Sequence, residues 1–286
     1  MLVTVDGVRW QELFEGPDPL LTRDDAPIFP RFWSEVAPLG RVYGDPTEGH
    51  EVRVATSSNA SLPGYMSIYA EEPQGCLTNA CGRVSVPTFL DRLHDELSMD
   101  ASQLEVLVAW SKLALATTGR DDVALVRTPE ADAAALSDDA YEFDRGAVQH
   151  GLEALSARRP RFLHLGLLDS DRYAHQGDYA RYLKVLRAYD ALLAEISARL
   201  DSKTALIVTT DHGRGLWDQW SEHGPQVPAS GRVWAYVKLP ADAKSLALVE
   251  PGARRFDHHD VRYTIETLFG LSTTSTSGFS TGFIAP

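Results

Sequence analysis

Residues 204–213 combine a short apolar run with an acid, an imidazole and a glycine at its end. The run is rich in β-branched residues, which is typical of a buried parallel strand, and Asp211, His212 and Gly213 follow it. Open α/β sheets place their sites at the carboxyl ends of such strands. A carboxylate oxygen and an imidazole nitrogen are both ligands for divalent cations, so this segment predicts metal chemistry. The alternative is a strand end whose aspartate only caps a turn.

Similar groups follow other predicted strands. The strand at residues 2–5 ends at Asp6, and the strand at 162–168 is followed by Asp171, with His175 four residues later. So many acids and imidazoles cannot be buried at one edge without a cation, because an unpaired buried charge is very unfavourable. We therefore expect two divalent metal ions, held by Asp6, Asp171, His175, Asp211, His212 and His223.

A candidate nucleophile lies at the predicted start of a helix. Ser61 precedes Pro63, and serine at the cap with proline just inside is a common helix beginning. A serine hydroxyl is a poor nucleophile at neutral pH, but a bound divalent cation and the positive end of a helix lower its pKa. Ser61 would therefore lie at the positive end of this helix, where a hydroxyl can be activated, and Ser58 and Thr56 lie in the polar turn before it.

These motifs, in this order, resemble the alkaline phosphatase superfamily, which includes nucleotide pyrophosphatase/phosphodiesterases, cofactor-independent phosphoglycerate mutases and sulfatases. The resemblance covers most of the chain, through residues 5–9, 61–65, Asp171 with His175, 210–213 and 222–224. It implies one metal ion on Asp6, Asp211, His212 and the nucleophile Ser61. It implies a second ion on Asp171, His175 and His223.

The resemblance also implies an activity, namely metal-dependent hydrolysis of small phosphoric esters, as a phosphatase or phosphodiesterase, through phosphoserine at Ser61. Mixed Asp and His ligands favour zinc, with manganese as the alternative. In the phosphodiesterase branch an asparagine downstream of the nucleophile contacts the phosphoryl oxygens. Asn79 lies at a comparable distance here, and its alternative role is that of a turn residue.

Other functions on the same fold remain open. Residues 61–65 lack the arginine of the sulfatase motif, which disfavours sulfate esters, and the chain lacks room for the inserted domain of phosphoglycerate mutases, which favours water as the acceptor. The alternatives are a sulfatase, a phosphotransferase, or an inactive pseudoenzyme that binds a phosphorylated ligand.

Composition excludes some partners. The chain has 286 residues and a net charge of −13, so its field repels nucleic acids and anionic membranes. It contains no run of about 18 apolar residues that would predict a membrane span. The first residues predict a core strand and not a signal peptide, so we expect an upstream segment, which would make export possible.

The pattern of elements predicts an α/β fold: a three-layer, alkaline phosphatase-like sandwich whose mostly parallel sheet is covered by helices on both faces. We expect one domain over residues 1–286. The expected strands are 2–5, 51–55, 104–110, 162–168, 204–210 and 232–238, and the expected helices are 86–97, 182–200 and 261–268, with one more starting near Ser61. Residues 8–50 predict a long loop with helical pieces, and 117–146 a partly helical excursion.

Several other residues have two interpretations. Cys76 and Cys81 either close a small disulfide loop or remain free thiols. Trp217 and Trp220 either line the mouth of the site or pack within their loop. His164 is expected to be a hydrogen-bonded core residue, Asn59 a turn residue, and the pair His258–His259 a cap or surface feature and not a metal site.

Overall fold

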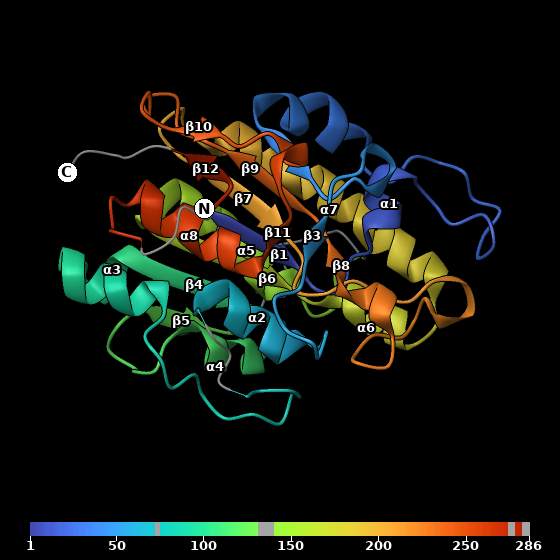
Figure 1. Cartoon of the computed structure of the whole chain (residues 1–286), viewed down its shortest axis with the longest axis horizontal. Coiled ribbons are helices and arrows are strands. Elements are labelled where there is room, and N and C mark those ends of the chain that lie inside the picture. The colour runs from blue at the N-terminus through green and yellow to red at the C-terminus, as the bar shows by residue number, and fades with distance from the viewer. Residues whose placement is uncertain (72–74, 131–139, 274–277, 282–286) are drawn as a thin grey trace.

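A seven-stranded sheet forms the centre of the computed structural model, which describes residues 1–71, 75–130, 140–273 and 278–281 (Figure 1). Its strands are β1 (Leu2–Val5), β2 (Arg41–Tyr43), β4 (Leu104–Val108), β5 (Leu125–Arg127), β6 (Phe162–Leu167), β7 (Leu206–Thr209) and β9 (Ala235–Lys238). Their order is β2-β9-β7-β1-β6-β4-β5. The five strands from β7 to β5 are parallel, whereas β9 is antiparallel to both β7 and β2. The predicted, mostly parallel sheet is confirmed.

Helices cover both faces of this sheet. They are α1 (Trp10–Phe14), α2 (Ser61–Tyr69), α3 (Phe89–Leu97), α4 (Ala114–Thr117), α5 (Arg145–Glu153), α6 (Asp169–His175), α7 (Tyr179–Arg199) and α8 (His258–Leu268). One buried apolar cluster joins one face of the sheet to α1, α5 and α7, and another joins the opposite face to α2, α3 and α8. Figure 1 shows α8 and α2 in front of the strands and α7 behind them. The three-layer α/β architecture is therefore confirmed.

Two small sheets lie outside the central one. β10 (Ala247–Leu248) pairs with β12 (Ser280–Thr281), and β3 (Val52–Arg53) pairs with β8 (Arg232–Val233) and β11 (Phe256–Asp257). Two expected strands are therefore wrong in part. The strand expected at 51–55 shrinks to β3, and the one at 232–238 is divided at Trp234 between β8 and β9, which belong to different sheets.

The central strand β1 positions the site. All four of its residues are buried, and it pairs in parallel with β6 on one side and β7 on the other. A fully buried strand of this kind is typical of a sheet covered on both faces. Asp6 follows β1 directly and therefore lies between the carboxyl ends of β6 and β7. The strand-helix-strand unit from β6 through α7 to β7 had been expected from the sequence, and it is present.

Local signals set the helix ends. Thr88 and Asp91 form a capping box, so α3 begins at Phe89 and not at residue 86. Ala60, and not Ser61, occupies the cap position of α2, and Ser61 is its first helical residue. In the segment 117–146, the described residues contain β5, a parallel edge strand that the sequence pattern did not predict; residues 131–139 lie outside the described part of the chain.

The open alternatives are resolved as follows. Cys76 and Cys81 form a disulfide. His164 is a buried core residue, with Nε2 2.9 Å from Thr4 Oγ1 and Nδ1 2.6 Å from Tyr69 Oη. The expected surface or capping role of His258 is wrong, because its ring is buried and Nε2 lies 3.0 Å from the carbonyl oxygen of Thr210.

No helix in the described residues is both long and apolar enough to cross a membrane.

Candidate metal centre

Asp6 and Asp211 lie side by side at the carboxyl ends of β1 and β7. Both are almost fully buried. The Gly7 amide donates to Asp211 Oδ1 at 3.1 Å, and the Tyr65 hydroxyl donates to Asp6 Oδ2 at 3.2 Å. The second oxygens, Asp6 Oδ1 and Asp211 Oδ2, are buried and find no hydrogen-bond partner within the described residues. Buried carboxylate oxygens without a donor are expected where a cation binds.

The protonation of these carboxylates supports the same conclusion. Burial raises the pKa of Asp6 well above its ordinary value, and the neighbouring Asp211 and Asp171 raise it further. Burial, followed by the charge of Asp171, raises the pKa of Asp211 to about 7. Without a cation the cluster therefore holds protons at neutral pH, because adjacent buried negative charges repel one another.

His212 points an unprotonated nitrogen at these oxygens. Its Nδ1 lies 2.8 Å from the carbonyl oxygen of Gly213, which can only accept, so Nδ1 carries the proton and Nε2 has a lone pair. Nε2 lies 3.4 Å from Asp6 Oδ1 and 3.6 Å from Asp211 Oδ2. Burial, with a smaller effect from His223, lowers the pKa of His212 well below its ordinary value, which keeps the ring neutral. The three ligand atoms lie within 4.8 Å of one another and form one candidate metal site.

Ser61 faces this site from α2. Its Oγ lies 3.2 Å from His212 Nε2, and the side chain is buried. The helix can approach because it carries Gly64 in its first turn: a Cβ there would lie 2.4 Å from the carbonyl oxygen of Asp211. The amino-terminal end of α2, with its positive partial charge, therefore lies against the end of β7.

The second cluster comes from α6 and from the loop after β7. Asp171 and His175 lie one turn apart on α6, with Oδ2 of the acid 3.4 Å from Nε2 of the imidazole. Asp171 follows the predicted strand as expected, but it lies within a helix, since α6 already begins at Asp169. His175 Nε2 lies 3.0 Å from His223 Nε2, a separation suited to two nitrogens that share a proton or a cation.

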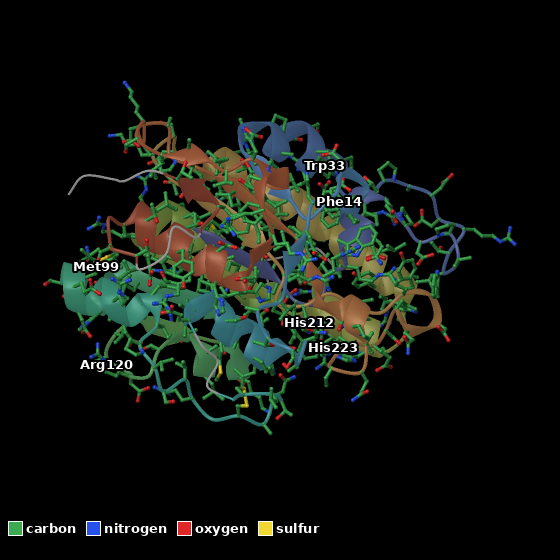
Figure 2. All side chains as sticks on the ribbon, viewed as in Figure 1. Phe14, Trp33, Met99, Arg120, His212 and His223 are labelled. Carbon is green, nitrogen blue, oxygen red and sulfur yellow. A yellow bond between two sulfur atoms is a disulfide. The ribbon has the colours of Figure 1, made fainter. Side chains whose placement is uncertain are left out.

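The orientation of His223 is fixed by its other nitrogen. Nδ1 donates to the carbonyl oxygen of Asn59 at 2.9 Å, a contact typical of metal-binding histidines. Asn59 has a left-handed backbone, with φ of 46°, so it is the turn residue that was expected. The ligand atoms of Asp171, His212 and His223 also lie within 4.8 Å of one another, which defines a second candidate site. Figure 2 shows His212 and His223 together near α6.

The structure thus brings all six predicted ligands and Ser61 to one edge of the sheet, from five separate stretches of the chain. His175 is the most exposed of the six, with 45% of its side chain accessible, and it lies beside the second candidate site, next to His223. The division of the six between two ions, with His175 on the second, stays a prediction.

Arg214 is a site residue that the sequence analysis missed. Its guanidinium is buried, forms an ion pair with Asp171, and donates to the carbonyl oxygens of Gly7 at 3.2 Å and Ser221 at 2.6 Å. It therefore connects the turn after β1, the start of α6 and the loop that carries His223. Its only signal in the sequence is its position next to the Asp211–Gly213 motif, which does not reveal a buried cation.

Asn79 lies beside the nucleophile. Its Oδ1 accepts from the Leu62 amide at 2.8 Å, at the start of α2. A cavity of about 400 Å³ opens next to these residues and is lined by Ser61, Asn79, Trp110, Leu168, Asp171, Arg172, His175 and Gln176. Trp217 and Trp220 do not line this cavity. Trp220 packs on Tyr179 and Tyr182 of α7, so it has a packing role but not one within its own loop, whereas Trp217 is largely exposed.

Comparisons with known proteins agree with this geometry. Residues 130–221 match the family described as the Metalloenzyme superfamily. A stretch of 121 residues is 30% identical to a phosphopentomutase of Caldanaerobacter subterraneus subsp. tengcongensis, which covers 42% of this chain but only 28% of that protein. The chain therefore matches less than a third of the length of this curated relative.

Solved structures share the fold over nearly the whole chain. A putative sulfatase from Bacteroides thetaiotaomicron superimposes with a TM-score of 0.67 at 12% identity, over 96% of this chain and 71% of that one. A mutant of TAB5 alkaline phosphatase with bound Mg superimposes with a TM-score of 0.58 at 10% identity, over 95% and 97%. The chain therefore has an alkaline phosphatase-like fold, part of it matches the Metalloenzyme superfamily, and its acids and histidines form two candidate metal sites.

Proposed function

We propose that the protein is a two-metal-dependent hydrolase of phosphoric esters that acts through a phosphoserine at Ser61. The observation that carries the proposal is the position of two buried, unpartnered carboxylate oxygens, Asp6 Oδ1 and Asp211 Oδ2. They face His212 Nε2, which is itself 3.2 Å from the Ser61 hydroxyl. A cation bound there has a hydroxyl within its reach.

The donor set fits two divalent cations. Asp6, Asp211, His212 and Ser61 would hold one, and Asp171, His175 and His223 the other. Oxygen and imidazole ligands in these proportions favour zinc, with manganese as the alternative. When bound, the cations would supply Lewis-acid stabilisation of phosphoryl oxygens and lower the pKa of a coordinated hydroxyl.

The residues around Ser61 suit in-line transfer. Its Oγ would form the new bond to phosphorus while the bond from phosphorus to the ester oxygen breaks, and a water would then attack the phosphoserine and restore the hydroxyl. The Oδ1 atom of Asn79 is occupied by the Leu62 amide, so its NH₂ group is left to donate to a phosphoryl oxygen. The start of α2 adds its positive partial charge on the same side.

Phosphotransfer to a second hydroxyl is the other candidate function. It is favoured by the stretch of sequence shared with phosphopentomutases, which are 30% and 32% identical over their aligned residues. The two candidates differ only in the acceptor, either water or an alcohol. The ratio of free phosphate to transferred phosphate in the presence of an added alcohol therefore distinguishes them.

The test is turnover of nitrophenyl phosphate, bis(nitrophenyl) phosphate and nitrophenyl sulfate by protein loaded with zinc or manganese, with and without chelator. We expect phosphate-ester turnover that chelator abolishes and that Ser61→Ala lowers by at least about 10³-fold, while metal content is retained. Ser58→Ala is the matched control, because Ser58 lies in the loop just before α2 and its hydroxyl lies 3.3 Å from Thr56 Oγ1. Loss of activity in Ser58→Ala but not in Ser61→Ala would assign the nucleophile to Ser58 and not to Ser61. No turnover of any ester would favour a pseudoenzyme that only binds its ligand.

A further inference from the structure

Arg172 is a cation at the site that neither the ligand assignment nor the proposed chemistry uses. It lies on α6 between Asp171 and His175, and it lines the same cavity as Ser61. Its guanidinium lies over the ring of Phe143, with Cζ 3.7 Å from the ring centroid. Stacking of this kind limits the orientations of the guanidinium but leaves its N–H edge able to donate.

This arginine has no acidic partner within the described residues, where no hydrogen bond or ion pair is formed by its side chain. The other arginines near the site are committed: Arg9 pairs with Glu12, and Arg214 pairs with Asp171. The Arg172 side chain is exposed, so its guanidinium is accessible to a ligand that enters the cavity. Because five donors in a planar fork match a carboxylate or phosphate, the ligand that suits it is an anion.

The other residues of the cavity indicate the chemistry of the group to which this anion is attached. At about 400 Å³ the cavity has room for more than the phosphoryl group. Trp110 and Leu168 give it an apolar wall, and Gln176 adds an amide at its edge. Arg172 is the one cationic side chain among its lining residues.

Resting on the proposed function, we propose that this cavity is a leaving-group pocket selective for phosphate esters whose alcohol carries a second anionic group, either a carboxylate or a phosphate. Arg172 binds the second anion and Trp110 packs against the carbon skeleton between the two. The pocket then selects substrates by a charge remote from the reacting phosphorus. Arg172 is a specificity residue in this arrangement and takes no part in bond breaking.

The test compares phenyl phosphate, 4-carboxyphenyl phosphate and 1,4-phenylene bisphosphate as substrates of the metal-loaded protein. Arg172→Gln should lower kcat/KM by about 10- to 100-fold for the two anionic esters, the range expected for loss of a charge-assisted hydrogen bond, and by less than about threefold for phenyl phosphate. For each ester, the kcat/KM of the variant is divided by that of the wild type, so that differences in intrinsic reactivity between the esters cancel. The carboxylate and bisphosphate arms tell which anion is preferred.

Two further variants serve as controls. Arg172→Lys keeps the charge but loses the fork, so it should retain part of the preference. Arg181→Gln is the matched control, because Arg181 also lies over a ring, that of Tyr173, but lines a different cavity; it should leave all three rates unchanged. An equal fall on all three esters would overturn the proposal, because Arg172 would then contact the transferred phosphoryl group. An unchanged preference in Arg172→Gln would overturn it as well.

The leaving-group pocket and the proposed hydrolase function can be tested independently. If the wild-type protein hydrolyses none of the esters, hydrolysis is wrong, and the pocket is tested by calorimetric binding of phenyl phosphate and 4-carboxyphenyl phosphate. Tighter binding of the carboxylated ester, lost in Arg172→Gln, would support the pocket. Equal binding of both compounds to wild type and variant would overturn it.

Discussion

The imidazole ring of His223 stacks on that of His212, with centroids 3.8 Å apart and planes inclined by 13°. His212 follows β7 directly, whereas His223 is brought back by a loop in which the Gly215 amide donates to the carbonyl oxygen of Glu222 at 2.8 Å. The stack therefore holds the two candidate metal sites next to each other. One ring faces Asp6 and Asp211, and the other faces Asp171 and His175.

Removing His223 should cost one metal ion and most of the activity. In His223→Ala we expect the bound metal to fall from two ions per chain to one, and kcat/KM to fall by at least about 10²-fold, because the second cluster loses an imidazole and the stack. Metal content measured by mass spectrometry, together with ester turnover, checks this. His150→Ala, on α5 and partnered with Glu153, is the control. A variant that still binds two ions would exclude His223 as a ligand.

Removing Arg214 should destabilise the fold as well as the site. Arg214→Met leaves the Asp171 carboxylate without its buried cation, and breaking a buried ion pair costs about 3–5 kcal/mol of unfolding free energy. Urea unfolding of the metal-free variant measures this loss. Arg187→Gln breaks a more exposed pair with Asp24 and should cost no more than about 1 kcal/mol. Equal losses in the two variants would contradict the bridging role of Arg214.

Metal affinity should rise as the pH rises through about 7. The raised pKa of Asp211, about 7, and that of Asp6 mean that metal-free protein holds protons which the cation must displace. The same shifts give the sign for stability. In the unfolded chain an aspartate loses its proton above a pKa of about 3.9, whereas Asp6 and Asp211 keep theirs in the folded protein. Their contribution to the free energy of unfolding is therefore lost as the pH rises through the raised pKa of the folded protein.

The lowered pKa of His212 acts in the opposite direction. The stability that it contributes is present above the pKa of histidine in the unfolded chain and is lost as the pH falls below about 6.5. Above pH 6.5 the carboxylates therefore dominate the pH dependence of stability among these site groups. The free energy of unfolding changes by up to about 1.4 kcal/mol per pH unit for each proton. Melting curves with and without zinc between pH 6.5 and 8 should diverge as pH increases. A gap that stays constant over this range would contradict the assignment of Asp6 and Asp211.

Adding one methyl group to α2 should displace the nucleophile. In Gly64→Ala the new Cβ would meet the Asp211 carbonyl at 2.4 Å, which forces α2 away from β7. We expect a loss of about 1–3 kcal/mol in stability and at least about 10²-fold in kcat. Gly82→Ala, which meets nothing within 4 Å, is the control for both measurements. Full activity in Gly64→Ala would mean that the position of Ser61 is not critical.

Much of this site could be predicted from the sequence because parallel strands deliver their next residues to one edge. Asp6 and Asp211 follow short, mostly apolar runs, and the resemblance to a known family added the pairing of Asp171 and His175 with His223. Arg214 could not be found in this way, since its role depends on the carbonyl oxygens of Gly7 and Ser221, which only the folded chain brings together.

The parts of the fold that were predicted poorly share a physical cause. β3 and β8 are only two residues long and lie in a separate small sheet, so side-chain alternation carries little signal there. His258 was expected to cap a helix or to lie at the surface because it precedes the helix expected at 261–268. It is buried because α8 starts against the end of β7, a contact between segments 48 residues apart.

The most direct test of the account is the anomalous scattering of zinc in crystals of the metal-loaded protein. We predict two zinc peaks about 3.5–4 Å apart, the first within bonding distance of Asp6, Asp211, His212 and Ser61, and the second of Asp171, His175 and His223. A lone peak distant from Asp6 and Asp211, or no peak at this edge of the sheet, would contradict it.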